Sequence, residues 1–229
     1  MNENMNEAIN VMKAMNVMKA MNEKIRFKKI IRLLEKKYPS AGTTLFENKD
    51  PFRFLICVIL SAQCTDAKVN SCAKQLFKEY PSDRALSHAP ILRLKSILKP
   101  LGLANAKSEY VRTVAGIESE KGIEWTMQGL QRLPGVGRKT ANVVLSEMFG
   151  ISEGIAVDTH CARISKRLGL TFSENPIEIE RDLTSLASKN KWGKITHLFI
   201  AHGRNICKAR KPKCNICLLA DMCPSCAKI

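Results

Sequence analysis

One short segment combines a tight turn with basic side chains. Residues 133–144 read LPGVGRKTANVV, so a proline and two glycines lie directly before an arginine and a lysine. Pro134 ends one helix and a second begins near Gly137, which predicts a helix-hairpin-helix turn. The glycines let a ligand approach the backbone, and the amides at the start of the second helix form an anion site. We expect a DNA phosphate to bind there, at Gly135, Val136, Gly137 and Arg138.

Two other interpretations of this segment stay open at this point. A phosphate-binding P-loop requires a glycine, four further residues and then Gly-Lys-Ser/Thr after a strand. Here Arg138 separates the glycine from the lysine, and a helix precedes the turn. An ordinary tight turn between two helices, with Lys139 in solvent, also satisfies the pattern.

The composition favours a nucleic acid as the partner. The chain has 229 residues, with 37 Lys and Arg against 21 Asp and Glu, a formal net charge of +16. Such an excess is typical of proteins that bind polyanions, nucleic acid before an anionic membrane. No segment is apolar over the roughly 18 residues that a membrane span requires, and no signal-peptide core is visible. We therefore expect an intracellular protein, cytoplasmic and associated with the nucleoid.

The second segment with chemistry is a cysteine cluster. In a reducing compartment, nine cysteines indicate a metal rather than disulfides. Four of them, spaced Cys-x6-Cys-x2-Cys-x5-Cys, are the candidate ligands: Cys207, Cys214, Cys217 and Cys223. Four thiolates suit an iron–sulfur cluster. Zinc is the alternative, because Cys226 forms a second Cys-x2-Cys pair with Cys223. Only five residues separate the two pairs, whereas zinc modules of this kind have about 15–20 there.

Positive charge is concentrated between the first two candidate ligands. The segment KARKPK lies there, and a bound metal would hold it in a fixed loop. A charge run is usually solvated surface, but a rigid basic loop is suited to contact phosphates. We therefore expect four side chains to contact DNA: Lys208, Arg210, Lys211 and Lys213.

The elements that must position these residues are predicted to be helices. Asp50 is a natural N-cap and Pro51 a natural first-turn residue, so the apolar run Phe54–Leu60 is interpreted as a buried helix. An amphipathic helix starts near Lys24. No alternating strand pattern is present, so the fold class is all-α. Further helices are expected at Ile91–Leu98, Lys107–Glu118, Met127–Leu133 and Thr140–Met148.

Three motifs together resemble a known family. The segments LPGVGRKTANVVL and AVDTHCAR, followed by the terminal cysteine set, resemble the endonuclease III family of helix-hairpin-helix DNA glycosylases. The resemblance runs from about residue 24 to 225. It implies a [4Fe–4S] cluster, because the cysteine spacing matches that of the family, and it implies damaged duplex DNA or an abasic site as the substrate.

The resemblance also implies roles for single residues. Lys139 attacks C1′ of the extruded nucleotide, forms a Schiff base and then allows β-elimination. The attacking amine must be neutral, which we expect partial burial and neighbouring cations to favour. Asp158 is both a natural helix N-cap and, by resemblance, the catalytic carboxylate. Gln63 and Leu103 fill the space that the extruded base leaves.

The expected architecture is two helical domains with a DNA cleft between them, across which the catalytic lysine and aspartate face each other. Residues 44–152 form a helical bundle that ends in the hairpin. Residues 23–43 and 153–229 form the domain that holds the cluster. Residues 1–22 contain the repeat VMKAMN twice and are expected to be a disordered or weakly helical extension.

The function expected from these features is base-excision repair of oxidised pyrimidines by a bifunctional DNA glycosylase and abasic-site lyase. We expect a monomer without a membrane partner. Two alternatives stay open: a mismatch or uracil glycosylase on the same scaffold, and a non-catalytic DNA-binding iron–sulfur protein. The second alternative predicts salt-sensitive DNA binding without a covalent intermediate.

Overall fold

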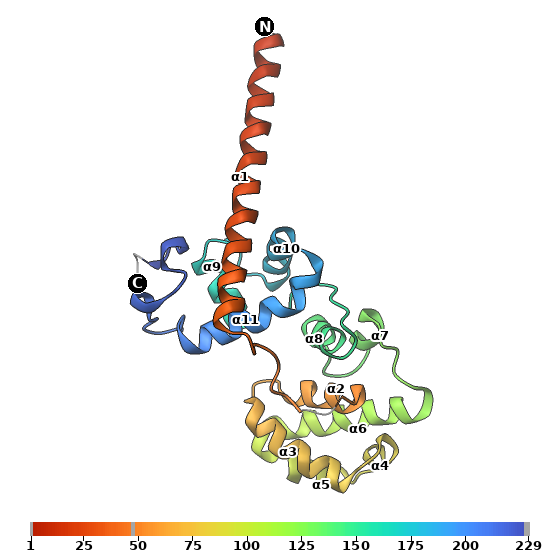
Figure 1. Cartoon of the computed structure of the whole chain (residues 1–229). Helices are drawn as coiled ribbons and strands as arrows, with labels where there is room; N and C mark the ends of the chain where they lie inside the picture. The colour runs from red at the N-terminus through yellow and green to blue at the C-terminus, as the bar shows by residue number, and fades with distance from the viewer. Residues whose placement is uncertain (1, 47–48, 227–229) are drawn as a thin grey trace. The chain divides into compact units, whose positions relative to one another are not determined.

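The structure is a computed structural model that describes residues 2–46 and 49–226, with side chains from residue 18 onward within those ranges. The described residues form helices and loops without a strand (Figure 1), so the all-α prediction is confirmed. The chain divides into two units, Gly42–Ala156 and Met1–Ala41 with Val157–Ile229. The sequence placed these boundaries at 44 and 152. No helix among the described residues is long and apolar enough to cross a membrane.

The unit Gly42–Ala156 is built around one buried helix. Its elements are α2 (Pro51–Leu60), α3 (Asp66–Glu79), α4 (Asp83–Ser87), α5 (Ile91–Leu98), the 3-10 turn η1 (Lys99–Leu101), α6 (Ala104–Lys121), α7 (Met127–Gln131) and α8 (Arg138–Phe149). Helix α2 packs against α3, α6 and α8, and eight of its ten residues are buried. Since it is apolar on nearly every side, it can only be stable inside the bundle.

The start of α2 follows the prediction from sequence. The Asp50 carboxylate accepts a hydrogen bond from the Arg53 amide at 3.2 Å, and Pro51 is the first helical residue. Cys57 is buried within this helix, and burial raises the pKa of its thiol to about 12. Such a thiol is inert and serves as packing. Cys72 and Cys161 are buried as well, whereas Cys64 is half-buried.

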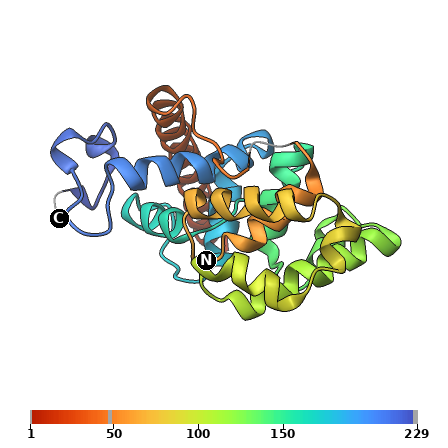
Figure 2. The same ribbon diagram turned by 90° about the horizontal axis from the view of Figure 1, so that it is seen from below.

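The other unit surrounds α11. Its elements are α1 (Asn2–Lys37), α9 (Thr159–Arg167), α10 (Pro176–Leu186), η2 (Lys189–Lys191), α11 (Trp192–Asn205), η3 (Cys214–Ile216) and η4 (Ala220–Met222). Helix α11 packs against α1 and α9. Figure 2 shows the chain continuing beyond the end of α11 as a compact loop segment, coloured deep blue. Helix α1 continues through residues 2–22, and the prediction of a disordered or weakly helical extension stays a prediction.

The inner face of α1 is apolar from residue 27 onward. Phe27, Ile30 and Leu34 are buried, whereas Ile25 is 63% exposed. The spacing of three and four residues from Phe27 is that of a single helix face, and Ile25 lies off it. Arg26 ties the helix to its unit by donating to the carbonyl oxygens of Leu168 and Met222, both at 2.9 Å.

Candidate functional site

The predicted helix-hairpin-helix turn is formed by α7, the following residues and α8. Thr126 caps α7 by accepting a hydrogen bond from the Gly129 amide at 3.0 Å. Val136 is 6% exposed, and its amide donates to the Leu133 carbonyl at 3.2 Å. The Val136 side chain thus anchors the turn in the core, so any contact of this residue with DNA has to use its backbone.

The two glycines of the turn have different physical roles. Gly135 has a φ of +78°, and a Cβ at this position would lie 2.6 Å from Cδ2 of Tyr110. Only glycine fits there without moving the ring or straining the backbone. Gly137 has an ordinary φ of −93° and is the N-cap of α8, and a Cβ on it would meet no atom within 4 Å. Its surroundings leave the backbone open to an approaching ligand.

Two basic side chains begin α8. Arg138 and Lys139 are its first two residues, and both are exposed. The Arg138 guanidinium donates to the Glu153 carbonyl at 3.4 Å. The expected partial burial of Lys139 is wrong for the chain itself, because the first turn of α8 projects this side chain away from the core.

Asp158 is the N-cap of α9, as predicted. Its Oδ1 accepts a hydrogen bond from the Cys161 amide at 2.7 Å, and the residue is half-buried. His160 follows within the first turn, and its Nδ1 lies 3.0 Å from Nη2 of Arg163. A Cβ on Gly203 would lie 2.4 Å from the same nitrogen, so α9 and α11 approach closely at this point. The cap fixes the position of one carboxylate oxygen of Asp158.

The residues predicted to fill the space of an extruded base share one backbone feature. Gln63 and Leu103 have φ values of +56° and +52°, the left-handed region that side chains with a Cβ disfavour. Both are exposed, Leu103 by 56%. Leu103 is the residue before α6, and Gln63 lies in the turn between α2 and α3. Each side chain therefore stands out from a tight turn.

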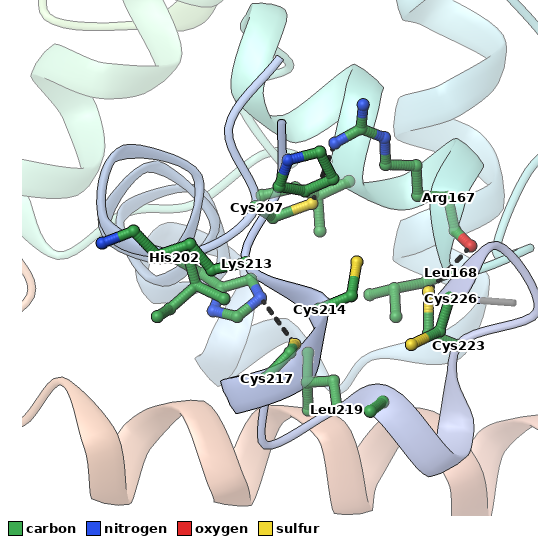
Figure 3. A pocket seen from close by; sticks show the side chains of 14 residues that line it. Arg167, Leu168, His202, Cys207, Lys213, Cys214, Cys217, Leu219, Cys223 and Cys226 are labelled. Atoms are coloured by element: carbon green, nitrogen blue, oxygen red, sulfur yellow. Dashed lines mark hydrogen bonds between the residues drawn. The ribbon is translucent and has the colours of Figure 1, made fainter. Parts of the chain in front are cut away.

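The candidate metal ligands are gathered in one pocket. Cys207, Cys214, Cys217 and Cys223 all line it, together with Cys226 (Figure 3). The rest of the lining is mainly apolar, with Ile164, Leu168, Ile206 and Leu219. Burial, and then the neighbouring Cys226, raise the pKa of Cys214. Thiols crowded in an apolar pocket release their protons only when a cation compensates their charge.

The arrangement of these sulfurs fits a cluster. Among the described side chains, no three of Cys, His, Asp and Glu converge on one position for a single ion. The thiols are instead distributed around the pocket, and a [4Fe–4S] cluster takes one thiolate at each of its four irons. Five thiols line this mainly apolar pocket, enough to supply the four thiolates that such a cluster takes.

Two arginines of α9, which the sequence did not single out, hold the segment after Cys207. The Arg167 guanidinium lies 3.3 Å from the Cys207 sulfur and donates to the carbonyl oxygens of Lys208 at 2.7 Å and Ala209 at 3.0 Å. Arg163 donates to the Cys207 carbonyl at 3.0 Å. Their spacing of four residues places both on one helix face, the only signal that the sequence offered.

The basic loop is held open to solvent by these contacts. Lys208, Arg210, Lys211 and Lys213 are all exposed. Lys211 has a φ of +49°, and the Lys213 amide donates to the Ile206 carbonyl at 3.0 Å. The loop closes on itself, and its four cationic residues are accessible to solvent, with Lys213 also bordering the cysteine pocket.

A hydrogen-bonded histidine also borders the pocket. His202 is 2% exposed; its Nδ1 lies 3.2 Å from the Tyr38 hydroxyl and its Nε2 lies 3.6 Å from the Cys217 sulfur. Burial lowers the pKa of His202 to about 4. The ring is therefore neutral at ordinary pH, and a proton on Nε2 would point toward the sulfur.

Comparisons with known proteins agree with this geometry. The model of the HhH-GPD superfamily base excision DNA repair proteins matches residues 56–189. Endonuclease III of Synechocystis sp. is 41% identical over 206 residues, which cover 89% of this chain and 94% of that protein. The chain belongs to the endonuclease III family. Endonuclease III of Escherichia coli is 37% identical over 184 residues, 79% of this chain and 87% of that one.

The remaining comparisons extend the family assignment to the cluster and to DNA. The model of the iron–sulfur binding domain of endonuclease III matches residues 207–223. The structure titled as a non-covalent endonuclease III–DNA complex has a TM-score of 0.83 and 37% identity, and covers 90% of this chain and 97% of that chain. This endonuclease III family member is a DNA glycosylase with abasic-site lyase activity and carries a [4Fe–4S] cluster.

Proposed function

We propose that this enzyme removes oxidised pyrimidines from duplex DNA with Lys139 as the nucleophile. The observation that carries the proposal is the exposed amine in the first turn of α8, directly after the glycine turn. A relative with 37% identity supports it, since its structure is titled as a trapped endonuclease III–DNA covalent intermediate. An amine beside a phosphate-binding turn is placed to meet a nucleotide that the same turn holds.

The proposed chemistry has two bond-breaking stages. The neutral Lys139 nitrogen attacks C1′, and the glycosidic bond breaks with its electron pair leaving on the base. A proton passes from the nitrogen to the ring oxygen O4′, the C1′–O4′ bond breaks to open the ring, and an iminium forms between the nitrogen and C1′. Loss of a proton from C2′ then expels the 3′ phosphate oxygen, which cuts the strand by β-elimination.

Asp158 is proposed to serve both stages as a carboxylate. One of its oxygens is engaged by the Cys161 amide, so the group is held in a fixed orientation. An ionised carboxylate stabilises the cationic character that the sugar gains as the base departs, and it can accept a proton during elimination.

The DNA contacts are proposed to come from three places on the surface. The backbone of Gly135, Val136 and Gly137, together with Arg138, holds a phosphate at the start of α8. Gln63 and Leu103 enter the stack when the target nucleotide is extruded. The basic loop adds contacts to phosphates that do not depend on sequence, from Lys208, Arg210, Lys211 and Lys213.

The cluster is proposed to be held by Cys207, Cys214, Cys217 and Cys223. When bound, it supplies a rigid covalent anchor for the loop between the first two ligands. The enzyme is proposed to act as a monomer in the cytoplasm, associated with the nucleoid and without a membrane partner. The exposed cations of the loop favour the same location, because duplex DNA is the polyanion that they fit.

The proposal is tested with a duplex that carries a single thymine glycol, a pyrimidine oxidised across its 5,6 bond. The wild-type enzyme is expected to release the base and cut the strand at that site, while Lys139→Gln is expected to do neither. Lys121→Gln removes the same charge from an exposed position at the end of α6 and is the matched control. Equal rates for the wild type and Lys139→Gln would exclude Lys139 as the nucleophile.

A further inference from the structure

Lys107 is a cation in the interior of the unit Gly42–Ala156. The residue is 2% exposed, although lysine is almost never buried without partners. Its Nζ donates to the carbonyl oxygen of Ala62 at 2.9 Å and to that of Leu101 at 3.0 Å. One ammonium group thus joins two turns that lie far apart in the sequence.

These two turns carry the two strained residues that are proposed to insert into DNA. Ala62 directly precedes Gln63, and Leu101 is two residues before Leu103. Among the described residues, Gln63 and Leu103 are two of three non-glycine residues with a positive φ. A left-handed backbone at such residues persists only where the surrounding structure imposes it. Lys107 supplies a direct restraint beside each of them.

Lys107 restrains Leu103 from a second direction. The Lys107 amide donates to the Leu103 carbonyl at 3.0 Å, closing the first turn of α6, while its side chain reaches the Leu101 carbonyl. The turn at Gln63 is closed locally by the Cys64 amide, which donates to the Ser61 carbonyl at 3.0 Å. The bond from Lys107 to Ala62 adds to this local closure a link to α6, 45 residues away.

A lysine suits this task for two reasons. Its stem packs in the apolar interior while its nitrogen offers three donors, enough for two carbonyls at once. Burial lowers the pKa of Lys107, but a neutral amine still keeps two N–H donors. The link between the turns therefore does not require a charge, only the nitrogen at that position.

We propose that Lys107 is a positioning residue that holds Gln63 and Leu103 together in the conformations with which they replace an extruded nucleotide. The inference rests on the proposed roles of Gln63 and Leu103. A preformed pair of inserting side chains costs less conformational entropy on binding than two independently mobile turns. Lys107 thereby acts on base extrusion without touching DNA.

The test uses Lys107→Met, which keeps most of the apolar stem and removes all donors. The probe is a duplex with 2-aminopurine next to an uncleavable abasic analogue. The fluorescence of 2-aminopurine rises when the base stack around it opens. We expect the rise on binding to be largely lost and base release from a thymine glycol duplex to slow by about 10- to 100-fold, as for a misplaced positioning group. Affinity for an undamaged duplex is expected to stay within about twofold, because the phosphate contacts remain.

Lys121→Met is the matched control, since it replaces an exposed lysine of the same helix and is expected to behave as the wild type. Circular dichroism checks that Lys107→Met is folded. If it is not, Lys107→Gln provides the test, because its shorter side chain reaches one carbonyl at most and should give a partial loss. A folded Lys107 variant with wild-type fluorescence and rate overturns the inference.

The two proposals fail in distinguishable ways. If Gln63→Ala and Leu103→Ala leave the fluorescence rise and base release unchanged, their proposed role in DNA is wrong and the inference falls with it. If those variants abolish the rise while Lys107→Met retains it, the inserting residues are correct and Lys107 does not position them.

Discussion

Gly135→Ala gives a sharp test of the hairpin, because the structure separates it from Gly137→Ala. An alanine at 135 must adopt a φ of +78°, which costs about 1–2 kcal/mol for an L-residue. Its Cβ would lie 2.6 Å from Cδ2 of Tyr110, and such overpacking costs about 1–3 kcal/mol. The lower conformational entropy of the unfolded alanine chain returns about 0.4–1 kcal/mol. We expect a net loss of about 3 kcal/mol in the free energy of unfolding.

Gly137→Ala is the matched control, which is expected to keep the stability of the protein and to weaken its binding to duplex DNA. Its φ of −93° suits alanine, and the added Cβ meets no atom within 4 Å. Alanine is a poorer N-cap than glycine by about 0.5–1 kcal/mol, which the unfolded-state gain of about 0.4–1 kcal/mol offsets. The stability should therefore change by less than about 1 kcal/mol, while a methyl group in the path of a phosphate weakens duplex binding by about tenfold.

The assay is urea unfolding followed by circular dichroism, under anaerobic conditions that keep the cluster intact, with duplex affinity measured by fluorescence anisotropy. The reasoning about the turn is refuted if Gly135→Ala is as stable as the wild type. It is refuted as well if the two variants lose equal stability, because the contact with Tyr110 and the left-handed φ would then have no effect.

Three further predictions concern the unit that contains α9 and α11. Cys207→Ser should abolish the visible absorbance of the cluster, whereas Cys226→Ser should retain it; the reverse result would assign a ligand position to Cys226. Asp158→Asn should keep the α9 cap, with stability within about 0.5 kcal/mol of the wild type, yet slow base release by about 100-fold or more; a normal rate would remove Asp158 from the chemistry. His202 stays neutral in the folded state down to a pH of about 4, whereas the unfolded chain takes up the proton near 6.5. The free energy of unfolding should therefore fall by about 3 kcal/mol as the pH drops from 6.5 to 4; His202→Gln should lack this part of the slope, and equal slopes would contradict the assignment.

Local sequence signals predicted the elements that carry strong start and stop residues. Asp50 and Pro51 fixed the beginning of α2, and Ile91–Leu98 is found as α5 with the predicted bounds. Helix α7 ends at Gln131 rather than Leu133, because a glycine turn follows so closely. Helix α6 starts three residues earlier than expected, since Leu103 takes the left-handed conformation and allows the helix to begin at Ala104.

The sequence motifs could not predict the tertiary contacts that support the residues of the site. Arg167 and His202 approach the cysteine pocket only because α9 and α11 pack together, and neither is close to the four cysteines in a recognisable pattern. Lys107 is the first residue of the predicted helix Lys107–Glu118, and no motif marks it as buried. Its burial depends on two carbonyls that tertiary folding brings to it, one of them 45 residues away.

For Lys139, the sequence motif predicted the position of the residue but not its exposure. A motif predicted its position at the start of α8, whereas its burial depended on tertiary neighbours, and the residue is exposed. The site as folded presents an exposed amine.

Borohydride trapping on a duplex with one abasic site tests the central claim most directly. Reduction converts the iminium between the enzyme and C1′ into a stable amine, so a covalent adduct is retained on a denaturing gel. We expect an adduct with the wild type and with Lys121→Gln, and none with Lys139→Gln. An undiminished adduct with Lys139→Gln, or tight binding by the wild type without any adduct, would contradict the assignment of Lys139 as the Schiff-base nucleophile.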